Sequence, residues 1–148
     1  MYDEMRWTTH FLFAVLAAYL FAKEQGGFVM GLVLLGSFLP DIDHPQSKLG
    51  SKIKWVGWLS QHRGFWHTPF AMLAVSSIVI VLTQVKMGVG FGIGYASHII
   101  LDTLTIKGVM LFYPFTRKRI TGPIETGSIS EGLFFVLLFI TLLIILWN

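Results

Sequence analysis

Five apolar segments, separated by short stretches that hold most of the charge, constrain this chain more than any other feature of its sequence. They lie at about 8–22, 26–39, 68–85, 88–106 and 132–147. The last three approach the roughly 20 residues that a helix needs to cross a bilayer, whereas the first two are short enough to be tilted or re-entrant. With 54% hydrophobic and only 13% charged residues, the chain has less charge than a typical soluble domain. We therefore predict one all-α domain over 1–148, a polytopic membrane helix bundle of about five segments.

The first segment has a second interpretation, as a cleaved signal peptide. The apolar stretch at 11–22 ends in small residues, but Asp3 and Glu4 precede it against one basic residue, Arg6. A signal peptide normally begins with a positively charged region. We therefore favour a retained helix.

The basic residues fall mostly on one side of the predicted bundle. If all five segments cross, Lys23 and Lys86 lie on one side and the other nine of the 11 Lys and Arg residues lie on the opposite side. An excess of Lys and Arg marks the cytoplasmic side of a membrane protein. We expect an integral protein of the inner (cell) membrane with the bilayer as its partner. The net charge of +3 is small and comes from loops, so no nucleic-acid partner is predicted.

All five histidines lie near segment ends that this topology places on the basic side. They are His10, His44, His62, His67 and His98. The chain has no cysteine, so His, Asp and Glu remain as the strong metal ligands. The shared placement predicts that side chains from distant parts of the chain meet around divalent metal at the cytoplasmic face.

A first cluster of ligand-type residues follows the second apolar segment. Asp41, Asp43 and His44 crowd into four residues directly after Pro40. Carboxylates this close repel one another unless a cation or a proton relieves the repulsion. An Asp-rich turn at a helix end is the structural alternative. That turn does not require the adjacent histidine, so metal binding is favoured.

A second pair lies inside the fourth apolar segment. The i, i+4 spacing of His98 and Asp102 puts both side chains on one helix face. An ionisable pair at membrane depth is costly and indicates function. Asp102 can act as a ligand or can orient the imidazole of His98 from behind. A purely structural pair inside the bundle is the alternative.

A third group precedes the third apolar segment. His62 and His67 are five residues apart, and both can reach one site only if the chain there is non-helical, which Gly64 permits. Arg63 carries a planar fork that matches phosphate or carboxylate oxygens. A lipid headgroup contact is the alternative role of this arginine.

His10 and Glu131 are the least constrained candidates. A lone histidine at a membrane interface often only meets water, and an acidic residue is favoured in the first turn of any helix. Both are kept as candidate ligands because both lie on the shared face.

Longer stretches around these residues resemble one protein family. LPDIDHPQS at 39–47, HRGFWHT at 62–68 and GYASHIILDTLTIKGVMLFYP at 94–114 are similar to the YdjM-like membrane-bound metal-dependent hydrolases. The pair Thr9-His10 and the TGSISE run ending at Glu131 resemble the other two motifs of that family, and Trp66 and Ala14 depart from its usual residues. The resemblance covers nearly the whole chain and implies hydrolase activity. The His-x-x-x-Asp helix is also similar to the arrangement in zinc-dependent phospholipase C.

A single catalytic zinc ion uses about three protein ligands and a water. This sequence offers nine candidate ligands, so we predict two or three divalent ions. Zinc is favoured, with manganese or iron as alternatives. We predict that metal-activated water hydrolyses a phosphoester of a lipid or lipid-linked substrate. Arg63 would stabilise phosphoryl oxygens, and Asp43 or Glu131 would be the general base. The alternatives are a divalent-metal transporter or sensor, and a non-catalytic membrane protein in which the metal only holds the helices together. The candidate ligands are His10, Asp41, Asp43, His44, His62, His67, His98, Asp102 and Glu131.

Overall fold

The computed structural model describes residues 5–43 and 64–147, and this part of the chain is mainly helical, with turns and two isolated β-bridges between 104 and 128. The five α-helices among these residues are α1 (Trp7–Ala22), α2 (Gly27–Phe38), α4 (Pro69–Leu82), α5 (Val85–Thr103) and α6 (Ile129–Trp147). Three 3-10 turns accompany them: η1 (Lys23–Gln25), η2 (Pro40–Asp43) and η3 (Phe65–His67). The predicted all-α fold is confirmed.

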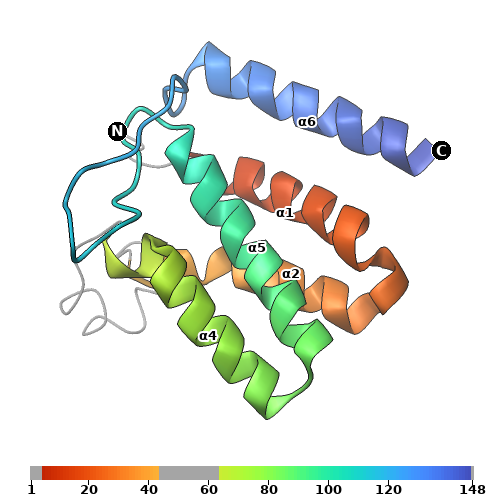
Figure 1. Ribbon diagram of the computed structural model, residues 1–148. Helices are drawn as coiled ribbons and strands as arrows, with labels where there is room; N and C mark the ends of the chain where they lie inside the picture. Colours follow the sequence, from red (N-terminus) through yellow and green to blue (C-terminus); the bar gives the residue numbers. More distant parts are fainter. Residues whose placement is uncertain (1–4, 44–63, 148) are drawn as a thin grey trace.

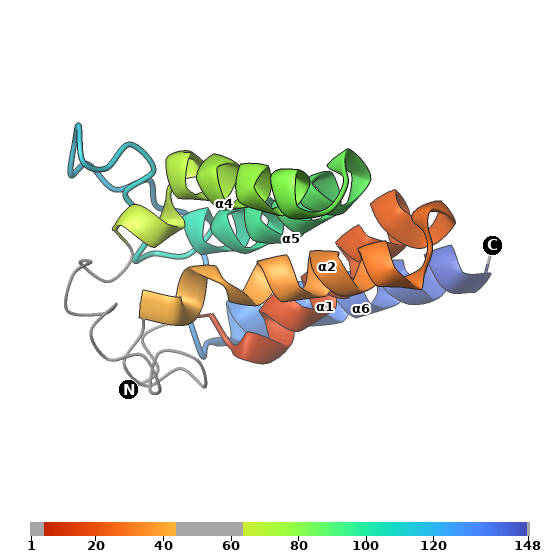
Figure 2. The same ribbon diagram turned by 90° about the horizontal axis from the view of Figure 1, so that it is seen from below.

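Helices α1 and α2 form one antiparallel hairpin and α4 and α5 form another (Figure 1). Helix α5 contacts α1, α2 and α4, so it is the central element of the bundle. Helix α6 packs along α1, where Leu138 and Leu142 meet Leu12 and Leu16. Seen from below, the start of α1, the end of α2, the start of α4 and the end of α5 lie at one end (Figure 2). We call this end of the molecule the site end.

Glycines bring the backbones of α2 and α5 into direct contact. A Cβ added at Gly94 would collide with the carbonyl oxygen of Val33, and one added at Gly36 would collide with that of Phe91. Small residues at such positions allow helices to approach closely. Gly31, by contrast, faces open space. The close contact between α2 and α5 therefore depends on Gly36 and Gly94.

Helices α2 and α4 are shorter than the apolar segments predicted there. By length and composition, α6 with its 19 residues is the one described helix suited to crossing a membrane. The apolar helices α2 and α4 have only 12 and 14 residues. Helix α5 has 19 residues but begins and ends three residues before the predicted segment. Helix length thus supports one crossing, and a bundle in which all five segments cross stays a prediction.

Candidate metal centre

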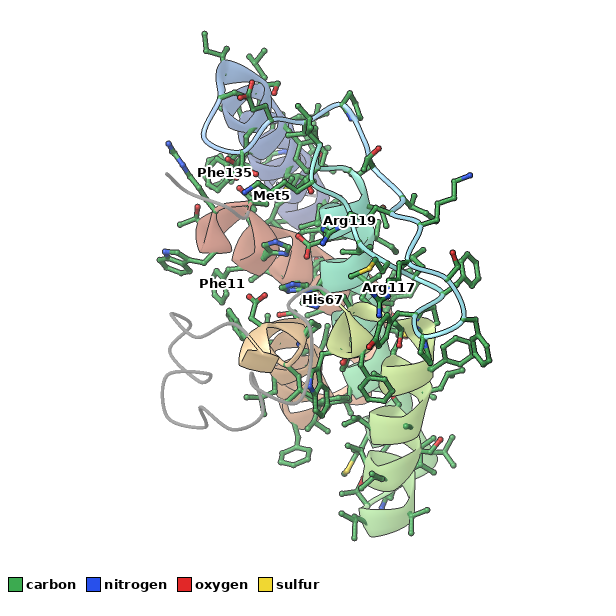
Figure 3. The ribbon with its side chains drawn as sticks, turned by 90° about the vertical axis from the view of Figure 1, so that its left-hand side faces the viewer. Met5, Phe11, His67, Arg117, Arg119 and Phe135 are labelled. Carbon is green, nitrogen blue, oxygen red and sulfur yellow. The ribbon has the colours of Figure 1, made fainter. Side chains whose placement is uncertain are left out.

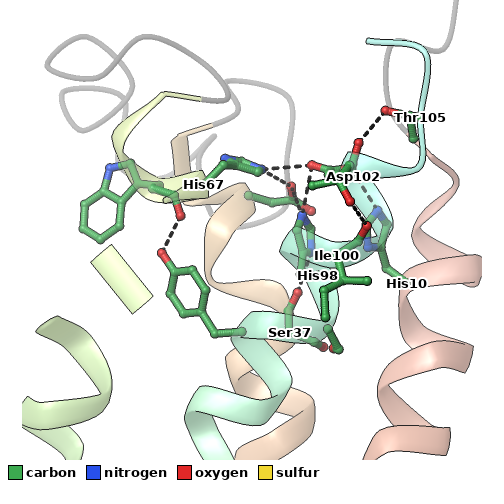
Figure 4. A network of polar contacts seen from close by, with 12 residues as sticks. His10, Ser37, His67, His98, Ile100, Asp102 and Thr105 are labelled. Atoms are coloured by element: carbon green, nitrogen blue, oxygen red, sulfur yellow. Dashed lines mark hydrogen bonds and ion pairs between the residues drawn. The ribbon is translucent and has the colours of Figure 1, made fainter. Parts of the chain in front are cut away.

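Three imidazoles and two carboxylates meet at the site end of the bundle (Figure 3, Figure 4). His10 comes from the first turn of α1, Asp41 from η2, His67 from η3, and His98 and Asp102 from the last turns of α5. Four of the five are at most 5% exposed, and Asp41, at the rim, is 26% exposed. The structure therefore brings together five of the nine predicted ligands from four separate parts of the chain.

Asp102 lies at the centre of this cluster. Its Oδ1 is 3.5 Å from Nε2 of His10, and its Oδ2 is 3.2 Å from Nε2 of His67 and 3.7 Å from Nε2 of His98. Because its two oxygens face different imidazoles, this carboxylate can hold cations on both of its sides. Sequence reasoning left open whether Asp102 is a ligand or only orients His98, and the geometry favours the ligand.

The separations within the cluster fit an intervening cation. Two ligands that each lie 2.0–2.1 Å from a tetrahedral zinc ion are about 3.3 Å apart. Nε2 of His98 lies 3.2 Å from Oδ1 of Asp41, which in turn lies 3.9 Å from Nε2 of His67. In each of two groups, His10 with His98 and Asp102, and Asp41 with His67 and His98, the ligand atoms lie within 4.8 Å of one another. These groups could each hold a metal ion, with His98 able to serve either one.

The tautomer of His98 supports the same conclusion. Its Nδ1 is 2.7 Å from the carbonyl oxygen of Ser37, near the end of α2. A carbonyl oxygen only accepts hydrogen bonds, so Nδ1 carries the proton. In the neutral ring Nε2 then carries a lone pair, and it lies 3.2 Å from Oδ1 of Asp41 and 3.7 Å from Oδ2 of Asp102. This lone pair faces the oxygens of Asp41 and Asp102, an arrangement that a cation between them would stabilise.

The charge of the cluster also favours a cation. Burial alone would raise the pKa of Asp41, but the nearby His98, together with His10 and His67, lowers that pKa well below its usual range. The Asp41 carboxyl is therefore ionised and ready to bind a cation. A divalent ion bound in place of the imidazole protons would balance the charges of the Asp41 and Asp102 carboxylates.

Two further residues position the ligands. Tyr95, fully buried one turn before His98, donates a 2.6 Å hydrogen bond to the carbonyl oxygen of Trp66, next to His67. Thr68 accepts a hydrogen bond from the backbone N–H of Ala71 and so caps the start of α4 directly after His67. Sequence reasoning assigned no role to Ser37 or Tyr95. The position of Tyr95 three residues before His98, on the same side of a helix, was the signal available for it.

The structure does not bring Glu131 into the cluster. Its carboxylate is 2% exposed and accepts hydrogen bonds from the backbone N–H groups of Arg6 and Gly127 and from the hydroxyl of Thr9. It thus joins the start of α6 to the start of α1. These three donors occupy both carboxylate oxygens, which is the physical reason why the predicted ligand and base roles of Glu131 are not supported.

The remaining candidates lie outside the described residues. These are His44, His62, Arg63 and the side chain of Asp43. Their predicted roles as ligands, phosphate clamp and base therefore stay predictions.

The fold and the site define a small all-helical protein with a buried His and Asp cluster suited to divalent metal. The family described as YdjM inner membrane protein matches residues 5–148, and the chain belongs to this family. The inner membrane protein YdjM of Escherichia coli (strain K12) is 32% identical over 88% of this chain and 78% of its own length. The uncharacterized protein YvsG of Bacillus subtilis (strain 168) is 40% identical over 67% of this chain, which spans about two thirds (66%) of that protein.

The family name supports a location in the inner membrane. No solved structure matches this chain. The site must therefore be interpreted from its own geometry.

Proposed function

We propose that this protein is a membrane-bound metal-dependent hydrolase that cleaves a phosphoester of a lipid or lipid-linked substrate. In this proposal the helices form a polytopic bundle, and the site end faces the cytoplasm. The observation that carries the proposal is the buried cluster in which the Asp102 carboxylate faces three imidazole nitrogens at 3.2–3.7 Å.

The group formed by Asp41, His67 and His98 has the character of a catalytic site. Structural zinc sites are closed by four protein ligands, whereas catalytic sites use three and leave one position for water. This group offers three ligands among the described residues, and Asp41 is partly exposed at its rim. An incoming phosphoester can therefore approach from the site end.

The chain's own residues would perform the remaining tasks. When bound, a divalent metal supplies an activated water and neutralises charge on the phosphoryl oxygens. The carbonyl of Ser37 fixes the tautomer of His98, and Tyr95 fixes the backbone beside His67. Asp102 faces both candidate groups and supports a site with two ions, of which zinc suits the mixed imidazole and carboxylate ligands best. Arg63 as the phosphate clamp and Asp43 as the base complete the proposal.

The position of the cluster favours hydrolysis over transport. A path for ions needs polar groups along the depth of the bilayer. The described ligand groups gather at one end of the bundle, and α4 and α6 carry no charged side chain beyond Glu131 in the first turn of α6. The site would thus meet substrates at headgroup depth.

The test is hydrolysis by the purified full-length protein in lipid vesicles after loading with zinc, manganese or iron. Phosphatidic acid, phosphatidylglycerol and a prenyl phosphate serve as substrates, and the products are phosphate, diacylglycerol or free alcohol. We expect turnover that falls at least 100-fold in Asp41→Asn and is unchanged in Glu125→Gln, which alters an exposed carboxylate outside the cluster. If no metal and substrate gave turnover, the proposed hydrolase activity would be wrong. If His98→Ala still lost its metal in that case, the metal site itself would stand. Uptake of metal into sealed vesicles would favour transport instead.

A further inference from the structure

The segment that joins α5 to α6 carries a concentrated positive charge on its surface. Between 104 and 124 it contains Lys107, Arg117, Lys118 and Arg119, all exposed, and no acidic residue. We call residues 104–124 the basic loop. Clusters of Lys and Arg beside a membrane attract anionic lipid headgroups.

The basic loop also exposes aromatic side chains. Phe112 is 54% exposed and Phe115 is 82% exposed, and the ring of Phe115 meets that of the half-exposed Phe70 from α4. Large apolar side chains beside basic ones are typical of surfaces that enter the interfacial region of a bilayer. The same loop therefore combines attraction to anionic headgroups with apolar anchors.

The basic loop is held in a defined shape. Val109 and Ile120 exchange backbone hydrogen bonds of 3.1 and 2.9 Å, and the backbone N–H of Gly122 donates to the carbonyl oxygen of Thr105 at 2.9 Å. Arg119 donates to the carbonyl oxygen of Lys107 at 3.3 Å. Its cations are thus presented by a fixed backbone.

The basic loop adjoins the candidate metal centre. The hydroxyl of Thr105 donates a 2.8 Å hydrogen bond to the backbone carbonyl oxygen of Asp102 (Figure 4). Seen end-on, Arg117 and Arg119 lie at the same end of the molecule as His67 (Figure 3). A lipid bound by the basic loop would therefore lie close to the ligand cluster.

An apolar cavity of about 350 Å³ lies between the basic loop, α4 and α5. Its wall is almost entirely aliphatic, and its lining includes Pro69, Met72, Ile99, Ile100, Leu111 and Ile120. Such a lining suits hydrocarbon and offers almost nothing to a polar ligand.

We propose that the basic loop and this cavity form a binding surface for an anionic phospholipid, with the headgroup on Arg117 and Lys118 and part of an acyl chain in the cavity. Neither feature alone specifies a lipid, but the charge complements a phosphate headgroup and the cavity complements its hydrocarbon chain. The further idea that this lipid resembles the substrate rests on the proposed function, whereas the binding itself does not require turnover.

The test is native mass spectrometry of the full-length protein in detergent with phosphatidylglycerol or phosphatidylcholine of identical acyl chains. The variant Arg117→Gln/Lys118→Gln removes two exposed cations whose side chains make no hydrogen bond or ion pair with the residues that the structure describes. Lys23→Gln/Lys86→Gln is the matched control, because it removes the same charge at the opposite end of the bundle. We expect preferential retention of phosphatidylglycerol by the wild type and the control, and a loss of roughly tenfold or more in that preference in the loop variant.

Equal preference in the two double variants, at unchanged melting temperatures, would overturn the proposal, as would a wild type that does not distinguish the lipids. Displacement of phosphatidylglycerol by an equal concentration of inorganic phosphate would also overturn it, since the surface would then bind anions and not lipid. A protein that selects phosphatidylglycerol but hydrolyses nothing would contradict only the proposed function.

Discussion

Replacement of Glu131 by glutamine should destabilise the protein without removing its metal. The carboxylate accepts three hydrogen bonds: Oε1 from the backbone N–H of Arg6 at 2.6 Å and from the hydroxyl of Thr9 at 3.2 Å, and Oε2 from the backbone N–H of Gly127 at 2.7 Å. A glutamine side chain has one oxygen and one NH2 group. In either orientation, its NH2 group therefore faces a backbone donor that it cannot satisfy.

The size of this effect follows from the bonds that are lost or weakened. Hydrogen bonds to a charged group contribute about 1.5–3 kcal/mol and neutral ones about 0.5–1.5 kcal/mol. Losing one charged bond and weakening the others should lower the free energy of unfolding by about 2–4 kcal/mol. For a chain of this size, that change corresponds to a fall in melting temperature of roughly 6–13 °C.

The assay is thermal unfolding of the full-length protein in detergent, together with its metal content. Glu125→Gln is the control, because this glutamate is exposed and should leave both quantities unchanged. If Glu131→Gln kept its melting temperature and lost metal, the assignment of Glu131 to the contact between α1 and α6 would be wrong, and the ligand or base role predicted from sequence would return.

Tyr95→Phe removes the hydrogen bond to the carbonyl oxygen of Trp66 and should lower the free energy of unfolding by about 1 kcal/mol and the metal affinity by about tenfold; unchanged affinity in a metal titration would refute the positioning role. Gly94→Ala should destabilise by about 3 kcal/mol, because its new methyl group meets the backbone of Val33. Gly31→Ala, at an open helical position, should be neutral or stabilising by about 0.5–1 kcal/mol; equal melting temperatures of the two alanine variants would contradict the close packing of α2 on α5.

The sequence allowed the convergence of the ligands to be predicted, because antiparallel hairpins bring alternate segment ends together. His10, Asp41, His67, His98 and Asp102 each lie at such an end, and the structure places them within one cluster. The i, i+4 spacing in α5 fixed the common face of His98 and Asp102. This part of the prediction required only the order of the apolar segments.

The sequence did not distinguish Glu131 from a ligand, because an acidic residue at the start of a helix has the same pattern in both roles. Its actual role depends on where the start of α1 packs, and the partner Arg6 is 125 residues away along the chain. A contact of that range follows from tertiary packing and not from local spacing.

The positioning residues were missed for a related reason. His98 is oriented by a backbone carbonyl, that of Ser37, and every residue carries such a group. Helix boundaries were also displaced, since apolar composition continues past the hydrogen-bonded turns: α4 ends at Leu82, three residues before the predicted end. Composition therefore locates an apolar stretch, whereas backbone hydrogen bonding determines where the helix begins and ends.

The metal content of the purified protein tests the central claim most directly. Full-length wild type, Asp102→Asn and the control Glu125→Gln would be equilibrated with zinc, dialysed and analysed by mass spectrometry of the elements. The cluster predicts at least one zinc ion per chain in the wild type and the control, and loss of most of that zinc in Asp102→Asn. A wild type that retains no zinc, manganese or iron, or an Asp102→Asn variant that retains as much as the wild type, would contradict it.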